Sequence, residues 1–125
     1  MDRLEEIFSL QKQFNDEVIA NRKLEGDDEL WMQRYMMAMF VEMAELLDET
    51  NYKWWKNPKV VDEDAVKEEL VDILHFFISL CIRSGMDAQD LYSRYLDKNK
   101  ENILRQQGKG KKDGYSLKEI ETPKM

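Results

Sequence analysis

The chain has 125 residues, 42% of them hydrophobic, which suits a single globular domain with one core. Charged residues make up 36% and the formal net charge is −7, so the surface is acidic and a binder of the DNA or RNA backbone is disfavoured. A single cysteine, no signal-peptide pattern at the amino terminus and no run of about 20 apolar residues predict a cytoplasmic protein without disulfides or a membrane partner.

Helix formers dominate residues 2 to 107, where apolar side chains are spaced three and four apart and strand-like alternation is absent. A first helix is expected to end before Gly26, and Asp27 or Asp28 can cap a second helix over residues 28–50. The second segment is apolar almost all round. We therefore expect it at the centre of the fold.

A loop over residues 51–61 follows and contains two adjacent tryptophans, which loops seldom expose without a purpose. Asp62 then caps a third helix over residues 63–83, which stops before Gly85. Apolar residues on one side of this helix, including Cys81, predict that it contributes to the core.

Asp87 caps a fourth helix, whose inward-facing apolar residues extend as far as Leu104. From Gly108 the core-facing pattern gives way to a basic, glycine-rich segment. We therefore expect a domain over residues 1–107, followed by a tail over residues 108–125 that is flexible unless a ligand or partner orders it.

Four helices with short connections predict an all-α fold, an antiparallel four-helix bundle. One member is nearly all apolar, and the chain contains eight methionines. Such helices bury more surface than one small bundle supplies, so we expect a homo-oligomer, either a homodimer or a tetramer.

Two pairs of acidic residues lie inside the apolar helix patterns, Glu42 with Glu45 and Glu69 with Asp72. Each pair is spaced i,i+3, so both acids lie on one helical face. If the two helices run antiparallel, the four carboxylates can face one another. Buried carboxylates need positive charge, and hard oxygen ligands suit Mg²⁺ together with substrate phosphates. The alternative is that these acids are solvated or ion-paired surface residues.

His75, the only histidine, lies three residues after Asp72. This spacing supplies half of a di-iron bundle motif, but the second histidine that the motif requires is missing. We therefore expect His75 to be a hydrogen-bonded neighbour of the acid cluster or a satisfied core residue.

Other polar and aromatic residues are candidates for binding a ligand. Gln11 and Asn15 are i,i+4 neighbours whose amides can pair with the edge of a pyrimidine. Trp55 can supply a flat wall for a base, and Lys53 and Lys56 beside it can reach phosphates. The alternative roles are a wet helix surface for the amides, core packing for the tryptophan and solvated loop lysines.

The fourth helix carries Lys98, Asn102 and Arg105 on one face, with Asn99 beside them. Lysine, arginine and amide side chains are the donors that a triphosphate requires, and arginine binds through its bidentate fork. This face can equally be an ordinary solvated surface.

These residues resemble the all-α nucleoside triphosphate pyrophosphohydrolases, the superfamily of the MazG-like enzymes and the dimeric dUTPases. The shared motif is E-x-x-E followed by E-x-x-D, which Glu42, Glu45, Glu69 and Asp72 match. In that family these positions hold magnesium and carry the catalysis. Further segments resemble the dimeric dUTPase branch and occur in its order: Leu10-Gln11 to Asn15-Asp16-Glu17, Lys53-Trp54-Trp55-Lys56, Val71-Asp72-Ile73-Leu74-His75-Phe76-Phe77, Lys98-Asn99, Asn102, Arg105-Gln106 and Gly114-Tyr115.

The resemblance implies a magnesium-dependent enzyme that hydrolyses dUTP to dUMP and pyrophosphate, with Tyr115 as a phosphate-contacting residue that a closing tail brings in. Alternatives are a house-cleaning enzyme for dCTP or for other dNTPs, including modified ones, and a non-catalytic nucleotide-binding or helical assembly module. Two departures concern the length of the chain. The extra helices of longer dimeric dUTPases are absent, and residues 107–113 separate the Arg-Gln pair from the Gly-Tyr pair that the family keeps close.

Overall fold

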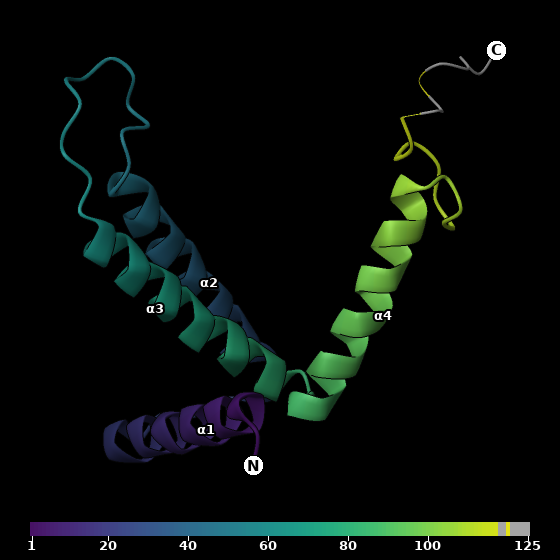
Figure 1. The fold of residues 1–125 in the computed structure, drawn as a ribbon. Helices are drawn as coiled ribbons and strands as arrows, with labels where there is room; N and C mark the ends of the chain where they lie inside the picture. The colour runs from purple at the N-terminus through teal and green to yellow at the C-terminus, as the bar shows by residue number, and fades with distance from the viewer. Residues whose placement is uncertain (118–119, 121–125) are drawn as a thin grey trace. The chain divides into compact units, whose positions relative to one another are not determined.

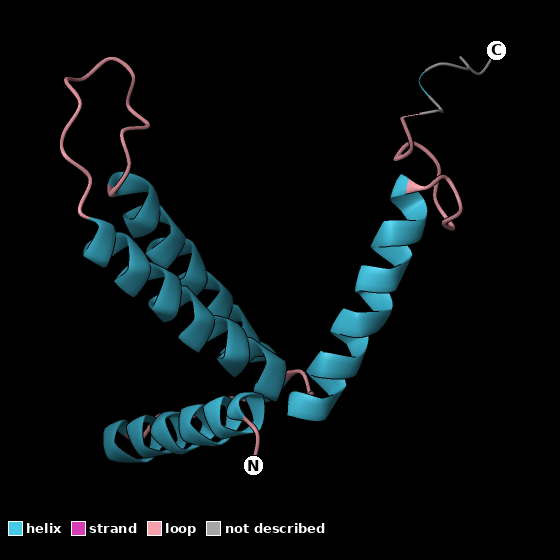
Figure 2. Ribbon diagram, viewed as in Figure 1, coloured by secondary structure: helices cyan, strands magenta, loops and turns pink. Residues whose placement is uncertain are grey.

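The computed structural model describes residues 1–117 and residue 120. Four helices make up most of this part of the chain: α1 (Arg3–Arg22), α2 (Asp28–Asp48), α3 (Glu63–Arg83) and α4 (Ala88–Gln106) (Figure 1). The described residues form no strand, as the secondary-structure colouring in Figure 2 shows. The predicted all-α class is confirmed, and the four helices are consistent with a helical bundle.

Aspartate caps start the first three helices. The side chain of Asp27 accepts from the backbone N–H of Leu30 at 2.8 Å, and Asp62 accepts from Ala65 at 3.1 Å. Asp2 caps α1 in the same way. An aspartate at this position satisfies an otherwise unpaired N–H and stabilises a helix by about 1 kcal/mol. Of the two caps predicted for α2, Asp27 is the one that forms and Asp28 is the first residue of the helix, while the predicted cap Asp62 starts α3.

Residues 1–87 form one compact unit in which α3 is the central helix. α2 packs antiparallel along α3, and α1 also packs on α3 (Figure 1). Ile78 and Ser79 of α3 are each only 1% exposed. The expectation that the second helix lies at the centre is therefore wrong for this unit. α3 is central because α1 and α2 both pack on it, whereas α2 packs extensively only on α3.

α2 keeps much of its apolar surface exposed. Trp31 and Tyr35 are its only buried residues among those described, and they stack with ring centroids 5.5 Å apart. Met37 is 68% exposed and Phe40 is 69% exposed. The apolar pattern of this helix therefore exceeds what the other helices of the unit cover.

Residues from Ala88 onward form a second compact unit, built on α4. The end of α4 is closed by Gly108, at a φ of 74° that glycine adopts without strain. The N–H of Lys109 then donates to the carbonyl of Leu104 at 2.8 Å. The predicted domain boundary after residue 107 stays a prediction, and residues 118–119 and 121–125 of the expected tail lie outside the described residues. None of the helices described is both long and apolar enough to cross a membrane.

Candidate functional site

Three carboxyl groups converge between α2 and α3. Oxygens of Glu42, Glu69 and Asp72 all lie within 4.8 Å of one another. Antiparallel packing brings Glu42 on α2 opposite the i,i+3 pair on α3. Glu45, the fourth acid of the motif, lies on α2 close enough to raise the pKa of Glu42. The structure thus brings together three predicted ligands and places the fourth beside them.

The side chains that act on Glu42, within the part of the chain that the structure describes, are acids and none is basic. Hydrogen bonding with Glu69 is the largest cause that raises the pKa of Glu42 to about 7, and burial and Glu45 add to it. The contact is between two acceptors, so it becomes a hydrogen bond only when one carboxyl is protonated. One buried oxygen of Glu42 and one of Glu69 have no hydrogen-bond partner among the described residues.

These properties fit a divalent cation of the hard, oxygen-binding class. Carboxylates crowded within 4.8 Å repel one another when all are charged, and a bound cation would remove that repulsion. Such an ion would also satisfy the two partnerless oxygens. Glu42, Glu69 and Asp72 are the residues placed to hold it, with Glu45 adjacent.

A chain of polar side chains joins α1 to α3. Gln11 donates from Nε2 to Oδ1 of Asn15 at 2.9 Å, and Asn15 donates from Nδ2 to Oγ of Ser79 at 2.9 Å. At the other end, Nδ1 of His75 is hydrogen-bonded to Oε1 of Gln11. The two predicted base-reading amides are therefore neighbours, as their spacing predicted, and His75 contacts Gln11.

An apolar pocket of about 400 Å³ lies beside this chain. Its volume is within the range of small-molecule sites, and its polar residues are Gln11 and His75. The rest of its lining is aliphatic and aromatic: Ile7, Leu10, Phe14, Val71, Leu74 and Ile78. A flat apolar ligand with a polar edge suits such a pocket.

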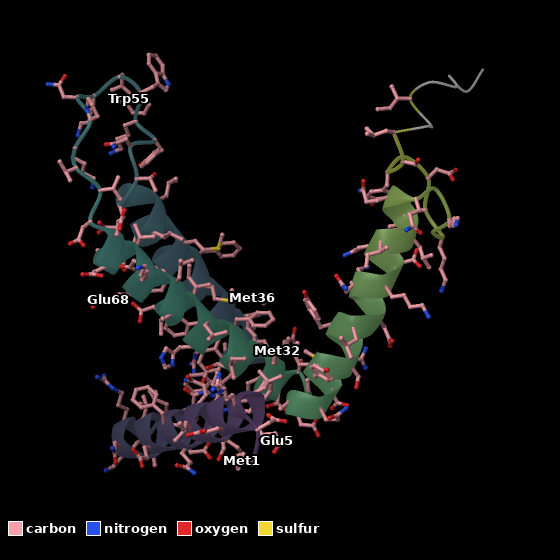
Figure 3. All side chains as sticks on the ribbon, in the orientation of Figure 1. Met1, Glu5, Met32, Met36, Trp55 and Glu68 are labelled. Carbon is pink, nitrogen blue, oxygen red and sulfur yellow. The ribbon has the colours of Figure 1, made fainter. Side chains whose placement is uncertain are left out.

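The loop between α2 and α3 is closed by Asn51. Its side-chain amide donates to the carbonyl of Lys59 at 2.9 Å and accepts from the N–H of Lys59 at 2.9 Å. Nζ of Lys59 also donates to the backbone carbonyl of Asp48. The two hydrogen bonds between Asn51 and Lys59 hold together the ends of the segment that carries the tryptophans. Trp55 in this segment is 62% exposed (Figure 3).

The same loop encloses a polar concavity of about 380 Å³. Lys53 and Lys56, the two predicted phosphate ligands, both line it, together with Lys59. Three lysines and one acid, Asp48, line the hollow, so its lining has a net positive charge and favours an anion. Trp55 does not line this hollow. It stacks edge-to-face on Trp54 instead, with ring centroids 5.5 Å apart and an interplanar angle of 84°.

The predicted phosphate residues of the second unit fall into two groups. Lys98, Asn99 and Asn102 are exposed on α4. Arg105 is instead held by Glu101, whose Oε1 accepts from its Nε at 3.3 Å, and its guanidinium carbon lies 5.4 Å from the ring centroid of Tyr115. The segment that separates Arg105 from Tyr115 in the sequence therefore returns the tyrosine to the arginine.

Glu101 fixes this return. The same Oε1 accepts from the backbone N–H of Lys111 at 2.8 Å, and this bond is the main cause that holds the pKa of Glu101 below its ordinary value. Gly110 passes so close to α4 that an added Cβ would lie 2.6 Å from Cγ of Arg105. Two contacts and one glycine therefore shape the segment.

Three residues of these arrangements were not among the sequence candidates: Ser79, Lys59 and Glu101. A signal existed for two of them. Ser79 is four residues after His75, and Glu101 is four residues before Arg105, which are the spacings of helix-surface partners. Lys59 offered only its place as a further lysine in the tryptophan loop.

Comparison with known proteins gives a family match. The family described as dUTPase matches residues 3–90. The dCTP pyrophosphatase of Enterobacteria phage T4 is 33% identical over 76 residues, which is 61% of this chain and 37% of the relative. The dCTP pyrophosphatase of Enterobacteria phage LZ5 is 32% identical over 76 residues, with the same coverage of both chains. This chain thus spans little more than a third of the length of these curated relatives.

No solved structure matches the chain at a significant level. The family match contains the four acids, both amides and the tryptophan loop, whereas Lys98 to Tyr115 lie beyond its end. It covers well over half of the chain. The predicted resemblance is confirmed, and the chain belongs to the dUTPase family.

Proposed function

We propose that the protein is a magnesium-dependent nucleoside triphosphate pyrophosphohydrolase. It adds water to a dNTP between the α and β phosphates and releases a dNMP and pyrophosphate, with dUTP as the favoured substrate. The observation that carries the proposal is the convergence of three carboxyl groups within 4.8 Å, with two buried oxygens that lack a partner. The family match and the name of the two relatives, dCTP pyrophosphatase, support the same class of reaction.

The acids have separate tasks in this proposal. Glu42, Glu69 and Asp72 hold the cation, which when bound neutralises phosphate charge and lowers the pKa of a water ligand. Glu45 is exposed and lies outside the tight trio. It is therefore the carboxylate best placed to accept the proton of the attacking water.

The nucleotide lies along α3. Ser79 lies seven residues after Asp72, which corresponds to about 10 Å along the helix. The polar chain of Gln11 and Asn15 therefore meets the base while the acids meet the phosphates. Lys53 and Lys56 bind the outer phosphates, and Trp55 stacks on the base when substrate binds. Lys98, Asn99, Asn102, Arg105 and Tyr115 stay proposed phosphate ligands of the second unit.

A second substrate deserves equal testing. Both curated relatives are named dCTP pyrophosphatases, whereas the family is described as dUTPase. Uracil and cytosine have the same ring size and differ at the polar edge that the amides would contact. We therefore propose dCTP as the alternative substrate. We also propose that the protein acts in the cytoplasm, where dNTPs are metabolised.

The working enzyme is a homodimer in this proposal. Met37 and Phe40 of α2 are more than two thirds exposed. Large exposed apolar patches mark interaction sites, and the symmetric dimer is the commonest soluble homo-oligomer. A second copy of the chain would cover this face.

A turnover screen tests the function. The full chain is incubated with each of the four dNTPs and dUTP, with magnesium or with EDTA, and dNMP and pyrophosphate are measured. We expect turnover of dUTP or dCTP with magnesium only. Glu45→Gln and Glu69→Gln should each lower kcat by about 100-fold or more.

The matched control is Glu68→Gln, which removes the same charge from the exposed side chain next to Glu69 (Figure 3). It should leave turnover unchanged. No turnover of any dNTP would overturn the enzyme proposal and favour the non-catalytic module. Preference for a purine would overturn the assignment of Gln11 and Asn15 to the base.

A further inference from the structure

We propose that Ser79 is a specificity-determining positioning residue, whose hydroxyl fixes the orientation of the Asn15 and Gln11 amides and thereby decides which pyrimidine is accepted. The inference rests on the proposed function, because it assumes that these amides read the base. Ser79 itself is 1% exposed, and the hydrogen bond that its Oγ accepts from Asn15 is its link to the two amides.

The hydroxyl proton of Ser79 has one place to go. Oγ of Ser79 lies 2.7 Å from the carbonyl oxygen of His75, which can only accept. A separation this short between two oxygens requires a proton between them. Ser79 therefore donates to the carbonyl, and its oxygen is left as an acceptor for Asn15.

The direction of the Ser79 hydroxyl determines the donor and acceptor roles of the side chains hydrogen-bonded in sequence to it. Asn15 must present its NH₂ to Ser79, since an inverted amide would place a second acceptor against a hydroxyl with only one proton. Its oxygen then accepts from Nε2 of Gln11. The oxygen of Gln11 accepts in turn from His75, whose Nδ1 carries a proton.

The fixed orientation leaves a defined set of groups for a ligand. Each amide nitrogen retains one N–H and each amide oxygen one lone pair. Uracil offers an acceptor oxygen at position 4 and a donor at N3, while cytosine offers a donor at position 4 and an acceptor at N3. A rigid donor and acceptor array accepts one of these edges, whereas an amide that can invert accepts both.

The position of the hydrogen-bonded side chains supports this role of Ser79. Gln11 is 6% exposed and, with His75, contributes the polar part of the lining of the 400 Å³ apolar pocket. Ser79 and Asn15 line a separate hollow of about 230 Å³, which shares no lining residue with the apolar pocket. The hydroxyl is thus buried behind the amides, where it can set their direction without occupying the space of the base.

The test compares Ser79→Ala with Ser79→Thr and Ser79→Cys. The ratio of kcat/KM for dUTP and dCTP is measured for each. Alanine removes the anchor, and we expect the ratio to move toward unity by about tenfold, while kcat for the preferred substrate changes little. Threonine keeps the hydroxyl and should restore the ratio. Cysteine has the shape of serine, but its S–H is a weak donor, so Ser79→Cys should move the ratio in the same direction as Ser79→Ala. It keeps the test open if Ser79→Ala does not fold.

Ser84→Ala is the matched control, because Ser84 makes the same kind of bond to the carbonyl of Cys81 but does not contact Asn15. It should leave the ratio unchanged. An unchanged ratio in both Ser79→Ala and Ser79→Cys, or an equal change in Ser84→Ala, would overturn the inference.

A second readout separates this inference from the proposed function. In NMR spectra of the nucleotide-free protein, Ser79→Ala should shift the side-chain amide protons of Asn15 and Gln11 and the Nδ1 signal of His75. This outcome is expected even if no dNTP is hydrolysed. If Nδ1 and both amides keep their wild-type signals, Ser79 does not position them.

Discussion

Glu42 presses its carboxyl against Glu69, so its affinity for a proton depends on whether a cation is present. Its pKa is about 7 in the folded, metal-free chain, compared with the ordinary 4.5. A raised carboxyl pKa contributes stability that is complete below pH 4.5 and is lost as the pH rises through 7. The metal-free cluster therefore destabilises the fold at neutral and alkaline pH.

We predict that in EDTA the free energy of unfolding falls between pH 5 and pH 8, and that Glu42→Gln removes much of this fall. The glutamine has no charge to repel Glu69, so the variant should be more stable than the wild type at pH 8. Urea unfolding at several pH values measures the effect. An unaltered pH profile in the variant would contradict the assignment.

Magnesium should act in the opposite direction at the same residues. We predict that magnesium raises the midpoint of thermal unfolding at pH 8, because an ion at a hundred times its Kd stabilises a fold by about 2.7 kcal/mol. Glu69→Gln should lose most of this rise, while Glu68→Gln should retain it. Equal responses of the two variants would show that the ion binds elsewhere.

The segment after α4 is shaped at the level of the element. An alanine at position 110 would place its Cβ 2.6 Å from Cγ of Arg105 and 2.9 Å from the backbone of that residue. We predict that Gly110→Ala displaces the segment, separates Tyr115 from Arg105 and raises KM several-fold, with little effect on the fold of residues 1–87.

Hydrogen exchange provides the measurement. The amide of Lys111, which donates to Glu101, should exchange faster in Gly110→Ala and in Glu101→Ala. Glu101→Gln keeps the accepting oxygen and serves as the control. Normal protection of Lys111 in Gly110→Ala would contradict the predicted displacement.

The sequence predicts where a helix begins and that the two acids of a pair share one helical face, because N-caps and i,i+3 spacing depend on only a few neighbouring residues. Asp27 and Asp62 predicted the starts of their helices, and the spacing predicted which side of α3 carries Asp72. The direction of the Ser79 hydroxyl depends on how α1 docks against α3, and no pattern within one helix contains that information.

The same distinction explains the error about the centre of the fold. An apolar helix must be covered, but its sequence does not say whether the cover comes from its own chain or from a second copy. α3 is the central helix even though Glu69 and Asp72 place two acids on the side that meets Glu42 of α2. Interhelical packing therefore decided what composition could not.

At the scale of the whole molecule, the exposed face of α2 gives a prediction about assembly. We predict a dimer in solution, and a shift to monomer in Phe40→Glu, because a charge at a covered apolar contact costs several kcal/mol. Light scattering after gel filtration measures the mass. Val60→Glu, at a loop residue that is 96% exposed, is the control. A monomeric wild type would contradict the proposal.

The segment over residues 107–114 folds against the helix that precedes it, with Glu101, Arg105 and Gly110 supplying the contacts. It is therefore a compact loop, and the residues that flank its two ends, Arg105 and Tyr115, lie against each other. Evolution can lengthen, shorten or delete such a loop without changing the separation of the two side chains that flank it. Distance along the sequence is consequently a poor guide to which homologous chains share the pairing of this arginine with this tyrosine.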